Sequence, residues 1–86
     1  MITARQVRAA RALLGWTQEM LAEKALVSLT ALKRMESANG LNVHHSTSEQ
    51  VRKALENGGI TFMASDHSEG VILIRPRTPT QESAAD

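Results

Sequence analysis

The stretch TQEMLAEKALVSLTALKRME, residues 17–36, reads as two short helices, 18–25 and 29–37, with a break between them. Thr17 and Ser28 each precede one helix and are typical N-cap residues, because their hydroxyl oxygens accept hydrogen bonds from the first turn. Neither helix is long enough to be stable alone in water. The sequence therefore predicts two short helices that persist by packing on each other and on their neighbours.

One further helix is predicted on each side of this pair. Before it, Thr3 and Gln6 match a capping box, and Gly15 is suited to end that helix in the left-handed conformation. After it, capping-box patterns at Ser46 and Thr47 predict the start of a fourth helix, which an Asn-Gly-Gly motif ends. The apolar residues of both helices recur at helical spacing, so the predicted fold class is mainly α.

The apolar pattern changes after the fourth helix. Residues 60–64 alternate in the manner of a strand, residues 65–70 form a polar loop, and residues 71–74 are a continuously apolar second strand. Both faces of the second strand are apolar, so we expect one face to lie on the helices and the other on a second copy of the chain. A hairpin folded wholly on its own core is the alternative. The sequence leaves open whether the fourth helix shares or carries the dimer contact, which is assigned to Ile60, Phe62, Val71, Ile72, Leu73 and Ile74.

Composition excludes several classes of function. The 86 residues include no Cys, which excludes disulfides, zinc–thiolate sites and thiol chemistry. The three histidines lack metal-ligand spacing, and no arrangement of Ser, His and Asp points to catalysis, so neither an enzyme nor a metal or other cofactor is expected. No apolar run suggests a membrane span or a signal peptide, so a cytoplasmic location is expected.

Charge is distributed unevenly although the net charge is only +1. Residues 1–35 hold six basic and two acidic side chains, a balance of +4, whereas residues 36–86 have a balance of −3. The basic half suits a polyanion, and the acidic half could contact polymerase or another protein. An ordinary mixed surface would explain the same counts, and Arg5 and Arg8 are interpreted as solvated surface residues.

Two short helices joined by a tight turn form a helix-turn-helix. The second helix can enter the major groove of DNA while the first crosses the backbone above it. The N-terminus of the first helix then directs free N–H groups at a phosphate. In the connection after the helix at 29–37, Asn39, Asn42 and His44 could contact phosphate, although loop polarity explains them equally well.

The segment GWTQEMLAEKALVSLTALKRME resembles the phage-repressor type of helix-turn-helix regulators, the Cro/cI or XRE family. Six of its residues fall in register with the family pattern: Gln18, Ala22, Val27, Ser28, Leu32 and Glu36. The resemblance covers residues 3–57 and implies a four- to five-helix DNA-binding domain that usually acts as a dimer on a palindromic operator. With the hairpin, this gives a DNA-binding domain at 1–58, a dimerisation element at 59–75 and a disordered tail at 76–86.

The resemblance also implies roles for individual residues. Arg34 is the best candidate for a bidentate contact to guanine, worth about 1–3 kcal/mol of discrimination. Arg11 and Glu36 match a salt bridge that ties the first helix to the end of the third. The full set of base contacts is Ser28, Leu29, Thr30, Lys33 and Arg34. The phosphate contacts at the start of the helix at 18–25 are Thr17 and Gln18.

One position departs from the family pattern. The family usually has Gly where this chain has Leu26, at a turn position with left-handed backbone. Leucine in that conformation costs about 1 kcal/mol or more. We expect either that the turn is reshaped or that burial of the Leu26 side chain offsets the strain.

The sequence thus predicts a regulator that binds double-stranded DNA as a homodimer without a cofactor. Repression is favoured, because a small dimer over a promoter blocks polymerase by occupancy alone. The alternative is a protein-interaction module, such as an antitoxin or an anti-activator, built on a helix-turn-helix scaffold. The low net charge and the apolar Leu29 favour that alternative.

Overall fold

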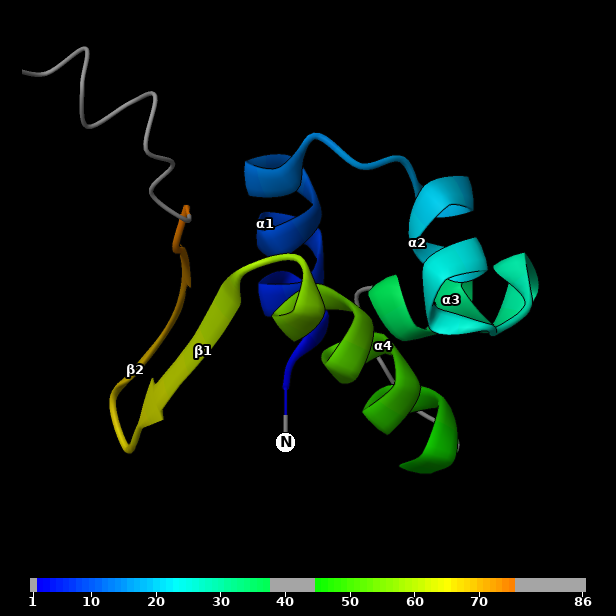
Figure 1. Cartoon of the computed structure of the whole chain (residues 1–86). Helices are drawn as coiled ribbons and strands as arrows, with labels where there is room; N and C mark the ends of the chain where they lie inside the picture. The colour runs from blue at the N-terminus through cyan, green and yellow to red at the C-terminus, as the bar shows by residue number, and fades with distance from the viewer. Residues whose placement is uncertain (1, 38–44, 76–86) are drawn as a thin grey trace, which may run out of the picture.

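A computed structural model describes residues 2–37 and 45–75. Within these residues the chain forms four helices followed by an antiparallel β-hairpin (Figure 1), which confirms the predicted fold class. The elements are α1 (Ala4–Leu14), α2 (Gln18–Ala25), α3 (Leu29–Glu36), α4 (His45–Asn57), β1 (Ile60–Ser65) and β2 (Ser68–Leu73). Of the described helices, none is long and apolar enough to cross a membrane. The predicted phosphate contacts Asn39, Asn42 and His44, and the predicted tail at 76–86, lie outside the described residues.

The helix ends follow the local signals of the sequence. The capping box of α1 is present, with the Thr3 hydroxyl accepting from the Gln6 N–H and the Gln6 side chain accepting from the Thr3 N–H. Gly15 ends α1 in the left-handed conformation, at φ 72°. The hydroxyls of Thr17 and Ser28 accept backbone hydrogen bonds from the first turns of α2 and α3, both at 3.0 Å.

The start of α4 differs from the prediction. The helix begins at His45, so Ser46 and Thr47 lie inside its first turn and are not the N-cap. Several hydroxyl residues in succession offer equivalent start positions, and local sequence does not choose between them.

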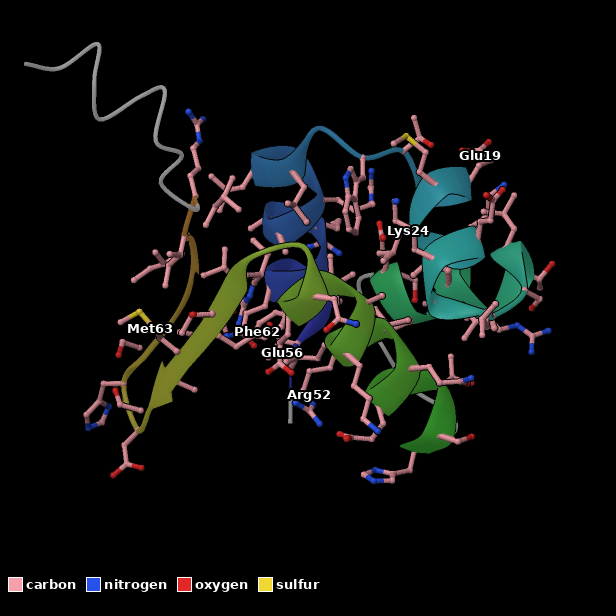
Figure 2. The ribbon with its side chains drawn as sticks, in the orientation of Figure 1. Glu19, Lys24, Arg52, Glu56, Phe62 and Met63 are labelled. Carbon is pink, nitrogen blue, oxygen red and sulfur yellow. The ribbon has the colours of Figure 1, made fainter. Side chains whose placement is uncertain are left out.

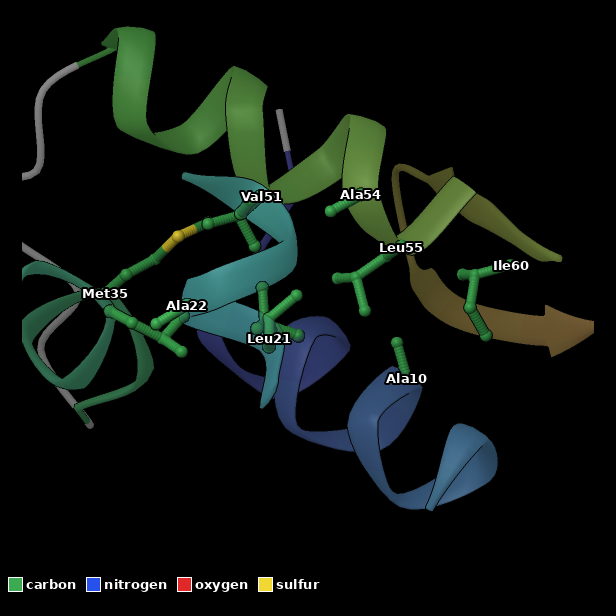
Figure 3. Close-up of a cluster of buried hydrophobic side chains, with 11 residues drawn as sticks. Ala10, Leu21, Ala22, Met35, Val51, Ala54, Leu55 and Ile60 are labelled. Carbon is green, nitrogen blue, oxygen red and sulfur yellow. The ribbon is translucent and has the colours of Figure 1, made fainter. Parts of the chain in front are cut away.

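All four helices and β1 contribute to one core. Figure 3 shows side chains from these five elements converging, with Leu21 of α2 and Leu55 of α4 among them. The largest fully buried side chains are Leu21, Leu32, Leu55, Val7 and Val51. Ala22 is also buried, and its small side chain lets α2 lie close to its neighbours. Each fully buried Leu or Val contributes about 1.5–3 kcal/mol to folding, so this core holds the two short helices in place.

The hairpin is longer than the apolar pattern indicated. Its register pairs Ile60 with Leu73 and Ser65 with Ser68, so the turn consists of residues 66–67 alone. The predicted hairpin is therefore confirmed, but its predicted bounds, a loop at 65–70 and a second strand at 71–74, were wrong. β2 begins at Ser68, because backbone pairing continues where the side chains are polar and exposed and give no apolar signal.

The two faces of the hairpin have different environments. Ile60 is buried, and Phe62, Val71 and Leu73 are partly buried against the core. On the other face Met63, Ile72 and Ile74 are 49%, 46% and 59% exposed, and we call these three the outer hairpin face. Figure 2 shows Phe62 pointing toward the helices and Met63 pointing away from them.

Both expectations for Leu26 were wrong. The turn is not reshaped, because Leu26 keeps the left-handed conformation, with φ 58° and ψ 42°. Nor is the side chain buried, because Leu26 is 83% exposed. The turn is held instead by backbone bonds, including one from the Val27 N–H to the Ala22 carbonyl at 3.1 Å. The strain at Leu26 is therefore not offset by packing of its own side chain.

Candidate nucleic-acid interface

α2 and α3 lie at the end of the molecule farthest from the hairpin, with α1 between them and the strands (Figure 1). The buried side chains of both short helices face the shared core. Among residues 2–37 and 45–75, no element packs on the opposite side of α3, which is the arrangement that groove binding requires.

Three side chains share the exposed side of α3. Thr30, Lys33 and Arg34 are all exposed and are spaced i, i+3 and i+4, which places them on one face of a helix. We call these three the recognition face. It carries two positive charges and one hydroxyl, and so combines phosphate attraction with groups that can hydrogen-bond to base edges.

The two residues at the start of α3 are less available than the sequence suggested. Leu29 is half-buried and packs against the core, so only part of its side chain can meet a ligand. Ser28 is exposed, but its hydroxyl is committed to the Ala31 N–H as the helix cap. Leu29 helps to pack α3 on the core and Ser28 caps it, so both are less available for contacts with bases.

At the start of α2 the sequence placed two phosphate ligands, Thr17 and Gln18. The Thr17 hydroxyl accepts from the Met20 N–H, and the half-buried Gln18 side chain donates to Glu36 Oε1 at 3.2 Å. Glu19, exposed in the first turn, adds a negative charge that opposes an approaching phosphate. The structure thus ties the Gln18 side chain to the interior of the helix pair.

Glu36 is the centre of the contacts that hold α3. Arg11 of α1 donates from Nε to Oε2 and from Nη2 to Oε1 of Glu36, both at 2.8 Å. The Glu36 side chain is 3% exposed, and a buried carboxylate requires such a partner. The hydrogen bonds with Glu36 raise the pKa of Arg11, against the opposing effect of its partial burial. Arg11 also donates to the Trp16 carbonyl at 3.1 Å. Its two bonds to Glu36 fix the C-terminal end of α3 on α1.

Arg5 and Arg8 are not simply solvated surface residues. Arg8 donates from Nη1 to the backbone carbonyl of Glu36, and Arg5 pairs with Glu69 of β2 at 2.7 Å. Both partners lie far away in sequence, so no local signal could have found these contacts.

Trp16 and Lys24 are two further residues that sequence reasoning did not place. The Lys24 ammonium lies 4.9 Å from the centre of the Trp16 ring, a cation–π distance, and Figure 2 shows Lys24 extending from α2 toward the preceding connection. The Trp16 ring also covers Gly58, where an added Cβ would come within 2.8 Å of it. The two contacts anchor the connection before α2 on the domain.

No group of three His, Asp or Glu side chains within residues 2–37 and 45–75 is arranged to hold a metal ion. Residues 7–45 match the family model described as Helix-turn-helix. The matched segment runs from α1 into the start of α4 and contains the whole recognition face, whereas the hairpin lies beyond it. A comparison with curated proteins gives no match.

Proposed function

Because the chain belongs, through residues 7–45, to the Cro/cI (XRE) family of helix-turn-helix regulators, we propose that it is a dimeric repressor of a palindromic operator. DNA binding itself is the activity of this family. The finer assignment comprises the dimer, the operator symmetry and repression. It is supported by the geometry of the recognition face and by the exposed apolar side chains of the outer hairpin face.

The recognition face carries this proposal. Arg34 would make a bidentate contact to guanine O6 and N7, Lys33 would hold a phosphate or a base edge, and Thr30 would meet a base or a thymine methyl. Their positions are supported by the burial of Leu32 and Met35 on the opposite side of α3 and by the Arg11–Glu36 pair at its end. Direct readout needs such a rigid presentation, because a mobile side chain loses more entropy when it binds.

Phosphate contacts would come from the start of α2. Thr17 and Gln18 stay proposed ligands, and the Gln18 side chain would share its N–H groups between Glu36 and a phosphate oxygen. Asn39, Asn42 and His44 stay proposed phosphate contacts on the strength of the sequence alone.

The outer hairpin face is the proposed dimer contact. Of the six residues assigned to the dimer from the sequence, Ile72 and Ile74 face outward, whereas Ile60, Phe62, Val71 and Leu73 pack on the chain's own core. Met63 joins the two outward residues. A second copy would cover this apolar surface, and a two-fold axis there would give the two recognition helices the symmetry of a palindromic operator.

A dimer of this kind would repress by covering a promoter, without a cofactor and without catalysis. Such a repressor would bind DNA in the cytoplasm, the location expected from the sequence. Contact with polymerase through the acidic half of the chain has less support, because Glu69 and Glu49 are already paired with Arg5 and Arg52.

One observation favours the alternative function, a protein-interaction module. Leu26 is 83% exposed beside the start of α3, and an exposed leucine there could meet an apolar partner. The partial burial of Leu29, by contrast, removes much of the apolar surface on α3 that had favoured this reading.

Binding to random-sequence duplex at two salt concentrations separates the two functions. For a DNA binder, log affinity falls linearly with log salt, with a slope of about −0.9 for each phosphate contacted. Lys33→Ala should make the slope shallower by about one. Arg75→Ala is the matched control, because it removes the same charge from an exposed residue just after β2. Binding that is absent or insensitive to salt would favour the protein-interaction module.

A further inference from the structure

Gln6 of α1 is fastened to both strands of the hairpin. Its Nε2 donates to the carbonyl oxygens of Met63 at 2.9 Å and Gly70 at 3.0 Å, two residues that pair across the hairpin. Its Oε1 accepts from the Thr3 N–H at 2.9 Å. Gln6 is only 3% exposed, and both of its side-chain N–H groups are used. A single carboxamide therefore joins the N-terminal end of α1 to β1 and β2 together.

A second contact lies beside this joint. Arg5 Nε is 2.7 Å from Glu69 Oε2, and the Thr3 hydroxyl donates to the same oxygen at 3.2 Å. The Arg5 side chain is 75% exposed, so this ion pair alone adds little to stability. It does restrict the orientation of the hairpin on α1, because hydrogen bonds are directional whereas apolar contacts allow sliding.

The same helix is fastened to α3 on its other side. Arg11 holds the Glu36 carboxylate and Arg8 binds the Glu36 backbone carbonyl. α1 packs against β2 and against α3, and Figure 1 shows it between the hairpin and the helix pair. Polar joints at Gln6 and at Arg11 thus connect the proposed dimer surface to the recognition face through one rigid helix.

We propose that Gln6 is a positioning residue that sets the spacing of the two half-sites that the dimer accepts, an inference that rests on the proposed dimeric function. Any tilt of the hairpin on α1 moves the two recognition helices of the dimer relative to each other. Neighbouring base pairs are about 3.4 Å apart along the DNA axis. A small tilt is therefore enough to favour a different spacing, and the Gln6 joint resists that tilt.

The experiment compares binding to duplexes that carry one or two copies of a half-site recovered by selection from random DNA. In the two-copy duplexes the centres lie about one DNA turn apart, 10–10.5 base pairs, or one or two base pairs more or less. We expect wild-type protein to prefer one spacing by about tenfold or more, because avidity is lost when both sites cannot be engaged together. In Gln6→Leu this preference should flatten, while affinity for the single half-site stays within about twofold.

A milder variant keeps the proposal testable where Gln6→Leu does not fold. Glu69→Gln weakens the neighbouring contact with Arg5 and should flatten the spacing preference in part. Glu49→Gln is its matched control, because it changes the charge equally and weakens an ion pair within α4 that joins no two elements.

The outcomes separate the positioning role from the proposed function. A flattened spacing preference with unchanged half-site affinity supports positioning by Gln6. An unchanged preference in a folded Gln6→Leu variant, or equal losses on one-copy and two-copy duplexes, overturns it and leaves the regulator assignment in place. Wild-type protein that binds no duplex overturns both.

Discussion

Arg11 of α1 and Glu36 of α3 form a bidentate ion pair with both N–O distances at 2.8 Å, and the carboxylate is almost fully buried. The pair holds the C-terminal end of the recognition helix on the first helix of the domain. Since both short helices depend on tertiary contacts, the loss of this pair should weaken the whole domain.

Arg11→Met should lower the free energy of unfolding by about 3 kcal/mol, because it leaves the Glu36 carboxylate buried without a partner. Replacing both residues by Met should restore most of the loss, since no unpaired charge is then buried. Urea unfolding measures both values. As a control, Arg52→Met, which removes surface ion pairs on α4, should cost much less than Arg11→Met, because exposed ion pairs are screened by solvent. A double variant as unstable as Arg11→Met would contradict this account of the pair.

Leu26→Gly should raise the melting temperature by about 4 °C or more, the shift expected for roughly 1 kcal/mol in a domain of this size. The reason is the positive φ of 58° at a side chain that is 83% exposed and has little packing to lose. Leu26→Ala is the matched control, because it removes the side chain and keeps the strain. Thermal unfolding followed by circular dichroism gives both values, and a lowered melting temperature for Leu26→Gly would show that the side chain stabilises the turn.

Ile72→Lys should convert a dimer to a folded monomer, because Ile72 lies on the outer hairpin face and is not needed in the core. Leu13→Lys provides the control, since Leu13 is equally exposed, at 46%, but lies on α1. Sedimentation equilibrium measures the association state and circular dichroism the fold. If Ile72→Lys associates as strongly as wild type, the dimer contact lies elsewhere.

Stability should fall in acid partly through Glu69. The hydrogen bond from Arg5, together with its charge, lowers the pKa of Glu69 below the usual value of 4.5. A carboxylate with a lowered pKa in the folded state stabilises the fold above pH 4.5, and this contribution is lost as the pH falls through the lowered pKa. Wild type should therefore exceed Glu69→Gln in melting temperature at pH 7, by a margin that shrinks below pH 4.5. A margin that stays constant with pH would refute the assignment.

Local signals explain how much of the fold could be predicted. The pair Thr3 and Gln6, the caps Thr17 and Ser28, and the turn at Gly15 all act within a few residues, so the sequence shows them directly. The outward spacing of Thr30, Lys33 and Arg34 also follows from helical periodicity once the inward residues are known.

Long-range partners explain what could not be predicted. Gln6 was recognised as a cap residue, but its bonds to Met63 and Gly70 join residues more than fifty positions apart. In the same way the hairpin pattern shows that both faces are apolar, but not which face lies on the helices. The partial burial of Leu29 depends on the packing of α3 against the core, which its residue type does not determine.

Sequence preference in Arg34→Ala tests the central claim, that the recognition face reads DNA, most directly. The measurement is the ratio of affinities for the duplex recovered by selection and for the same duplex with one base pair of its half-site changed, at fixed salt. Arg75→Ala is the control for the loss of one positive charge. At one position of the half-site, Arg34→Ala should reduce the ratio by about tenfold, within the 1–3 kcal/mol of a bidentate base contact, whereas Arg75→Ala should leave it unchanged. Equal ratios for wild type and Arg34→Ala at every position would contradict the claim.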